Sequence, residues 1–113
     1  MAVKSKSNKK SLEKIKQILS YINDHYNEEI TIEDMADYCF YSKSYFMKFF
    51  KETMGMSFIV YLNDYRLEIA AKMLLATSDN ILDIASKTGF SNLSYFNRSF
   101  KKKYGVSPGK YRK

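Results

Sequence analysis

The chain has 113 residues, of which 45% are hydrophobic and 16% aromatic, and its formal net charge is +7. This composition supports one packed domain and argues against intrinsic disorder. No apolar stretch approaches the ~20 residues of a membrane span, and the N-terminus lacks the apolar segment of a secretory signal. Because Cys39 is the only cysteine, no internal disulfide can form, which fits a reducing, cytoplasmic location.

The positive charge is concentrated at the two ends of the chain. Residues 1–16 hold six lysines and one glutamate, residues 101–113 hold six basic residues and no acidic one, and the segment between them is net acidic. A basic balance favours nucleic acid as a partner. Solubilising tails account for the N-terminal share at least as well, so charge alone does not decide the function.

Four glycines and one proline in the whole chain favour an all-helical fold. Residues 1–10 are rich in Lys and Ser without apolar periodicity, which predicts a flexible basic leader or linker. Residues 11–113 are predicted to form the structured domain. From Leu12 to Ile22 the apolar residues recur at helical spacing, which predicts a first helix ending near residues 23–27.

A first helix-turn-helix is predicted at about residues 31–55. Thr31, with Asp34 three residues later, resembles a capping box at the start of a short helix. Ser42 is placed to cap the next helix, and Gly55 to end it by adopting a positive φ. The order of short helix, tight turn, amphipathic helix and glycine stop indicates the motif.

A long helix is predicted at about residues 57–76, spanning about 30 Å at ~1.5 Å per residue. One apolar stripe runs from Phe58 to Met73, and a second face carries Ile59, Ala70 and Leu74, so the helix is too broadly apolar for a single neighbour.

A second helix-turn-helix is predicted at about residues 80–105. Asn80 and Ser91 are the expected caps of its two helices, and Gly105 is the expected stop. Ser107-Pro108 then opens a last short turn.

The two halves are copies of each other. Residues 43–61 and 93–111 are identical at 8 of 19 positions. Upstream of these segments the best match is shifted by 49 residues instead of 50, so the second copy has one extra residue between its turn and its helix. Two copies are too few for a solenoid, which needs ~3 repeats. The predicted fold is all-α, with about seven helices and two helix-turn-helix subdomains joined by a long linker helix.

The second copy, "IASKTGFSNLSYFNRSFKKKYGVSPGKYR" at residues 84–112, resembles the signature of the AraC/XylS family of bacterial transcription regulators. The stretch "YRLEIAAKMLLAT", residues 65–77, is similar to the linker helix of that family, and the resemblance covers roughly residues 12–113. It implies sequence-specific binding of double-stranded DNA, no cofactor, and RNA polymerase as a candidate further partner. The first copy has Phe40 where many members have glycine, which costs ~1–2 kcal/mol if the turn needs positive φ.

By this resemblance, the outward faces of the two recognition helices read base edges in the major groove. Arg98 can chelate guanine, Asn97 or Asn92 can pair with adenine, and Met47 and Leu93 can touch thymine methyls. The predicted base-contacting residues are Lys43, Ser44, Met47 and Lys48 in the first copy and Asn92, Leu93, Ser94, Asn97 and Arg98 in the second. The predicted phosphate-contacting residues are Lys51, Lys101 and Lys102.

Other functions are less well supported by the residues. His25 is the only histidine, Cys39 has no basic neighbour in sequence, and no metal-ligand spacing or phosphate-binding glycine loop occurs, so we predict no enzyme activity and a buried structural thiol. A helical protein-interaction module is the stronger alternative, although it does not explain two matched outer faces. Tyr61 and Tyr111, at matched places, are predicted to pack against the ends of the recognition helices.

The family often joins this DNA-binding unit to an N-terminal sensing or dimerisation domain. We therefore expect the chain to be the C-terminal part of a larger regulator rather than a stand-alone one. The isolated domain is expected to be a monomer, with dimers forming through the missing N-terminal part.

Overall fold

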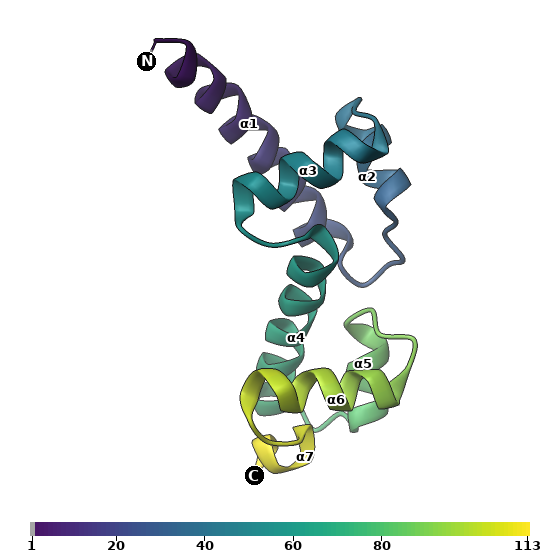
Figure 1. The fold of residues 1–113 in the computed structure, drawn as a ribbon. Helices are drawn as coiled ribbons and strands as arrows, with labels where there is room; N and C mark the ends of the chain where they lie inside the picture. Colours follow the sequence, from purple (N-terminus) through teal and green to yellow (C-terminus); the bar gives the residue numbers. More distant parts are fainter. Residues whose placement is uncertain (1) are drawn as a thin grey trace. The chain divides into compact units, whose positions relative to one another are not determined.

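The computed structural model describes the backbone from residue 2 to residue 113 and the side chains from Lys9 onward (Figure 1). In chain order its helices are α1 (Ala2–His25), α2 (Ile32–Cys39), α3 (Lys43–Met54), α4 (Phe58–Ala76), α5 (Ile81–Lys87), α6 (Leu93–Tyr104) and α7 (Pro108–Arg112). The described residues contain no strand, so the predicted all-α fold of about seven helices is confirmed.

The chain divides into two compact units. Unit one comprises the residues up to His25 together with Ile30–Leu62, and unit two comprises Tyr26–Glu29 together with Asn63–Lys113. Unit one contains the helix-turn-helix of α2 and α3, and unit two contains that of α5 and α6. The first residues of α4 belong to unit one and the remainder to unit two.

The helix starts follow local hydrogen bonding, largely as the sequence predicts. Thr31 Oγ1 accepts from the Asp34 N–H at 3.0 Å while Asp34 Oδ2 accepts from the Thr31 N–H at 3.1 Å, which completes a capping box on α2. Ser42 caps α3, Asn80 caps α5 and Ser107 caps α7, each by a side-chain oxygen that accepts from the backbone N–H three residues later. These caps satisfy N–H groups that the helices themselves leave without partners.

The cap of α6 differs from the prediction. Asn92, not Ser91, is the capping residue, and its Oδ1 accepts from the Tyr95 N–H at 2.9 Å. Phe40 and Gly89, the positive-φ residues of the two turns, are 49 positions apart, whereas the caps Ser42 and Asn92 are 50 apart. Ser91 is therefore the extra residue of the second copy. Because Ser and Asn are equally good caps, residue type alone could not choose between them.

The N-terminal segment also differs from the prediction. The sequence predicts a flexible leader over residues 1–10, whereas α1 begins at Ala2 and is helical through this stretch. No glycine or proline interrupts residues 2–25, and lysine and alanine have good helix propensities, so a helix can continue from the apolar stripe toward the N-terminus.

The core of unit one is aromatic. Phe46, Phe50 and Phe58 are fully buried, and the Phe58 ring meets the other two edge-on at centroid distances of 5.5 and 5.4 Å. Ile18 and Ile22 of α1 and Met35 of α2 are also fully buried in this unit.

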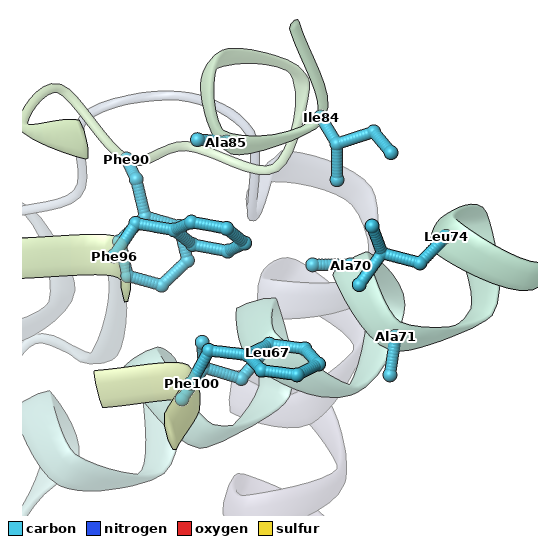
Figure 2. Close-up of a cluster of buried hydrophobic side chains, with 9 residues drawn as sticks. All are labelled: Leu67, Ala70, Ala71, Leu74, Ile84, Ala85, Phe90, Phe96 and Phe100. Atoms are coloured by element: carbon cyan, nitrogen blue, oxygen red, sulfur yellow. The ribbon is translucent and has the colours of Figure 1, made fainter. Parts of the chain in front are cut away.

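The core of unit two is built around α4, as Figure 2 shows. It consists of Leu67, Ala70, Ala71, Leu74, Ile84, Ala85, Phe90, Phe96 and Phe100. Ile59, predicted on a buried face, is 46% exposed instead. The two ends of α4 belong to different units, so no single stripe is buried along its whole length.

Two tyrosines at matched positions pack against the buried phenylalanines of α3 and α6. The Tyr61 ring lies 5.6 Å from that of Phe50 in unit one, and the Tyr111 ring lies 5.2 Å from that of Phe100 in unit two. Both pairs meet edge-on, which confirms the predicted packing role of the two tyrosines. In unit two Arg112 additionally donates from Nε to the Leu74 carbonyl at 3.0 Å, which ties α7 to the end of α4.

Candidate nucleic-acid interface

The first candidate surface is the outer face of α3. The helix buries Phe46, Phe49 and Phe50, which fixes its rotation about its axis. The predicted residues Lys43, Ser44, Met47 and Lys48 are all exposed on the remaining surface. Met47 is 50% exposed, so its apolar side chain is accessible for contact with a thymine methyl group.

One residue of this face is already paired. Lys43 Nζ lies 3.1 Å from Glu33 Oε2, and both side chains are more than half exposed. A backbone hydrogen bond at the start of α2 and then Lys43 lower the pKa of the Glu33 carboxyl, so Glu33 is charged at neutral pH. Lys43 would therefore have to exchange Glu33 for a base or phosphate on binding DNA, at little cost because the pair is exposed.

The second candidate surface is the outer face of α6. Phe96 and Phe100 are buried, and the five predicted residues Asn92, Leu93, Ser94, Asn97 and Arg98 are exposed. Asn92 Oδ1 already accepts the capping hydrogen bond, so its side chain is held against the start of α6 and is less free to turn toward a base. Bidentate pairing with adenine needs both the oxygen and the amino group. Asn97 is therefore the better placed of the two asparagines for adenine.

A groove of about 440 Å³ brings several of these residues together within unit two. Leu93, Asn97, Arg98 and Lys101 of α6 line it, opposite Ile81 and the Ser107–Gly109 segment at the start of α7. Ile81, Leu93 and Pro108 supply apolar atoms, and Arg98 and Lys101 supply positive charge. Such a surface suits the edge of a DNA strand, where apolar sugar and methyl groups adjoin charged phosphates.

The lysines near the ends of the recognition helices are not equivalent. Lys51, Lys101 and Lys102, the predicted phosphate contacts, are exposed. The side chain of Lys103 is only 25% exposed, and its Nζ lies 3.8 Å from Asp64 Oδ2 and 3.7 Å from Glu68 Oε2. Lys103 is therefore held against α4 and is less available to phosphate than its two neighbours.

The turns of the two motifs share a positive φ and the same hydrogen bond despite different residues. Phe40 has φ 60° and Gly89 has φ 99°. The Phe40 N–H donates to the Asp37 carbonyl and the Gly89 N–H to the Ser86 carbonyl, each at 3.1 Å. Among the described residues Phe40 is the only non-glycine with positive φ. Phe40 therefore keeps the positive φ and the hydrogen bond of the glycine turn, at the cost of backbone strain.

Sequence reasoning missed Arg66, which supports the second turn from within unit two. Arg66 is nearly buried, and its Nε and Nη2 donate to the carbonyls of Tyr26 and Glu28 at 2.7 and 2.8 Å. Burial lowers the pKa of its guanidinium, which still remains charged at neutral pH. A Cβ atom added at Gly89 would lie 2.6 Å from the Tyr26 oxygen and 2.7 Å from Arg66 Nε. The sequence carries no clear signal of this role, because Arg66 lies among other polar residues such as Asp64 and Glu68.

The cysteine and the acidic side chains are the other candidates for metal or catalytic groups. Cys39 is buried, and desolvation raises the pKa of its thiol, so it stays protonated as the sequence predicts for a structural cysteine. No cluster of His, Cys, Asp or Glu side chains among the described residues has three or more members that could hold a metal ion. Every helix in the described part of the chain is too short or too polar to cross a bilayer.

Known proteins share this arrangement. A helix-turn-helix domain family matches residues 35–113. Regulatory protein PocR of Salmonella typhimurium is 39% identical over 100 residues, which cover 88% of this chain and 33% of PocR. The chain thus spans about a third of the length of that relative.

Two solved structures have the same fold over most of their length. The C-terminal domain of AraT, a response regulator from Geobacillus stearothermophilus, is 36% identical with a TM-score of 0.82, over 88% of this chain and 83% of that one. A transcriptional regulator from Chromobacterium violaceum with an AraC-type DNA-binding domain is 25% identical with a TM-score of 0.83, over 90% and 91%. The chain therefore belongs to the AraC-type helix-turn-helix family.

Proposed function

We propose that this chain is the DNA-binding part of a transcription regulator and that α3 and α6 each read base edges in a major groove. The observation that carries the proposal is that α3 and α6 divide in the same way into a buried face and an exposed face. Each buries phenylalanines at matched positions and exposes a matched face that carries lysine, asparagine or arginine. A helical protein-interaction module has no need for two such faces.

The exposed side chains divide into two roles. Arg98 binds the O6 and N7 acceptors of guanine, Asn97 pairs with adenine, and Met47 and Leu93 contact thymine methyl groups. Lys51, Lys101 and Lys102 bind phosphates, which set the position of the protein on the duplex without reading its sequence. The proposed action is binding without chemistry at the DNA, in agreement with relatives that are transcription regulators.

Doubling the motif lets one chain read two successive major grooves. The 19 residues of α4 span about 28 Å at ~1.5 Å per residue, close to the ~34 Å of one DNA turn. The proposed site therefore has two short blocks about ten base pairs apart, and it need not be palindromic. Any mismatch in spacing is absorbed by bending the DNA, at about 1–6 kcal/mol.

The rest of a larger regulator would decide when this unit acts. We propose that the regulator works in the cytoplasm, that dimerisation and ligand sensing lie outside this chain, and that RNA polymerase is a further partner at the promoter.

Selection of bound sequences from random duplex DNA tests the proposal directly. We expect two conserved blocks about ten base pairs apart, and binding that weakens steeply as salt rises. Inserting five base pairs between the blocks turns the second groove to the far side and should abolish bipartite binding. Full-strength binding after the insertion would show that only one recognition helix reads DNA. A chain that selects no sequence and binds without salt dependence would favour the protein-interaction alternative.

A further inference from the structure

A second polar groove lies in unit one, beside the reading face of α3. It has a volume of about 400 Å³ and separates α1 from the start of α3. Lys10, Glu13 and Lys14 line it from α1, and Tyr41, Tyr45 and Phe49 line it from the opposite side. None of these residues was among the predicted DNA contacts.

The wall formed by α3 and its preceding turn is a cluster of aromatic rings. The Tyr41 ring meets Tyr45 edge-on at 4.7 Å and Phe49 at 5.5 Å. Phe49 is buried, whereas Tyr45 is 52% exposed. The cluster therefore holds the Tyr45 ring in place while its outer edge remains open to solvent.

Lys14 is held at the mouth of the groove. Its Nζ lies 5.4 Å from the centre of the Tyr41 ring and donates to the Cys39 carbonyl at 3.4 Å. These contacts place a positive charge beside the turn between α2 and α3, at partial burial. Lys10 lies one helical turn earlier on the same side of α1 and is exposed.

The groove offers donors suited to an anion. Two ammonium groups, Lys10 and Lys14, face one carboxylate, Glu13, so the lining has a net positive charge. Burial, assisted by Tyr45 and Cys39, raises the pKa of the Tyr41 hydroxyl, which stays neutral. Lysine and tyrosine groups of this kind bind the oxygens of DNA phosphates.

The position of the groove beside α3 indicates that this phosphate belongs to the DNA that α3 enters. Residues on a helix advance by about 100° each, so Tyr45 projects beside Lys48 on one flank of the reading face. When a recognition helix enters a major groove, the strands that border the groove run along its two flanks. The flank that carries Tyr45 leads directly into the groove between α1 and α3.

The corresponding place in unit two has different chemistry. In unit two Asn63 of α4 lies beside this place, and its Nδ2 donates to the Tyr95 hydroxyl at 3.0 Å. Tyr95 is the counterpart of Tyr45, 50 residues later. A neutral amide thus engages the tyrosine in unit two, whereas in unit one Tyr45 lines a groove together with Lys10 and Lys14.

We propose that the groove between α1 and α3 binds a backbone phosphate of the DNA strand bordering the major groove that α3 enters. Lys10 and Lys14 contact the phosphate oxygens, and the Tyr45 hydroxyl donates a hydrogen bond to the same group. This proposal rests on the proposed function and adds α1 to the DNA-binding surface. It gives unit one a sequence-independent anchor that unit two lacks at the matched position.

The salt dependence of DNA binding tests the assignment. Changing both Lys10→Ala and Lys14→Ala should reduce the slope of log K against log salt by ~0.9, the value for one lost phosphate contact. The ratio of the affinity at 50 mM salt to that at 200 mM should then be about threefold smaller for the variant than for the wild type. The weakening should be equal on the selected site and on an unrelated duplex. Lys16→Ala, an exposed lysine of α1 outside the groove lining, is the matched control and should leave the slope unchanged.

Two single changes separate charge from hydrogen bonding. Glu13→Gln removes the only carboxylate of the lining and should tighten binding to both duplexes. Tyr45→Phe removes only the hydroxyl and should weaken binding about equally at every salt concentration. Thermal melting of each variant checks folding. If loss of the Lys14 hydrogen bond unfolds unit one, the single change Lys10→Ala replaces the double variant in the salt titration.

The outcomes distinguish this proposal from the proposed function. Salt-dependent, sequence-selective binding by the wild type, with an unchanged slope in the folded lysine variants, would overturn the phosphate site and leave the DNA-binding function standing. Absence of salt-dependent DNA binding by the wild type would overturn both. Weakening confined to the selected site would show that the groove contributes to base reading instead.

Discussion

Phe40 and Gly89 occupy the same place in the two helix-turn-helix motifs and both have positive φ, yet their surroundings differ. The Phe40 side chain is 93% exposed and meets no steric barrier. At Gly89 a side chain would collide with the Tyr26 carbonyl and Arg66. One copy of the turn tolerates a side chain at the cost of strain, and the other excludes any side chain. Equivalent sequence positions in a repeat can therefore carry unequal constraints, because their neighbours are not themselves repeated.

Among the changes that compare the two units, removing a core phenylalanine should have the largest effect on stability. Phe96→Ala or Phe100→Ala should destabilise unit two by ~3–5 kcal/mol, since each removes a fully buried ring from a close-packed cluster. Phe46→Ala and Phe50→Ala are the matched changes in unit one. Calorimetric melting and amide hydrogen exchange of the four variants measure the loss and locate it. Unchanged melting of the unit-two variants would contradict the inward orientation of these rings.

Gly89→Ala is expected to destabilise unit two by about 3 kcal/mol. It combines the ~1–2 kcal/mol of left-handed strain with an overlap against a backbone oxygen that cannot move freely. Gly105→Ala is the matched control, because Gly105 has φ 81° but no atom within 4 Å of an added Cβ. Urea unfolding should show the control losing only the strain energy. Equal losses in the two variants would mean that Tyr26 and Arg66 do not constrain the turn.

Base reading by α6 is the next largest effect. Arg98→Ala should cost ~1–3 kcal/mol on the selected DNA site and leave non-specific binding nearly unchanged. Lys101→Ala, one turn along the same helix, should weaken all sequences alike and reduce the salt slope by ~1. Titrations on matched specific and unrelated duplexes at several salt concentrations separate the two patterns. Uniform weakening by Arg98→Ala would remove it from the base-reading residues.

Phe40→Gly is expected to stabilise unit one by about 0.5–1 kcal/mol. Glycine removes ~1–2 kcal/mol of left-handed strain but loses ~0.5–1 kcal/mol through its more flexible unfolded state. Little packing is lost, since the ring is almost fully exposed. Chemical denaturation measures the change, and Phe40→Ala, which keeps the strain, is its control. Destabilisation by glycine, with alanine neutral, would indicate that the phenylalanine contributes a contact in unit one.

Local signals in the sequence predicted most of the helices. The capping box of Thr31 and Asp34, the Ser42 cap and the Gly55 stop each depend on residues within about four positions. The inward phenylalanines of α3 and α6 followed from helical periodicity, and that periodicity also placed the predicted contact residues on the exposed faces. The start of α1 was not predicted, because an exposed Lys/Ser-rich helix has no apolar stripe to reveal it.

By itself, the sequence determined that the chain is helical, that it contains two copies of one motif, and which faces of the recognition helices lie inward. These properties depend on hydrogen bonds and side-chain spacing within a few residues. The tertiary structure alone decided that Gly89 must lack a side chain, because its neighbours Tyr26 and Arg66 lie 63 and 23 residues away in the chain. It likewise brought Lys14 to Cys39 across 25 residues and formed the groove beside α3. Contacts over such separations arise only when helices pack together, and no local pattern of residue types records them.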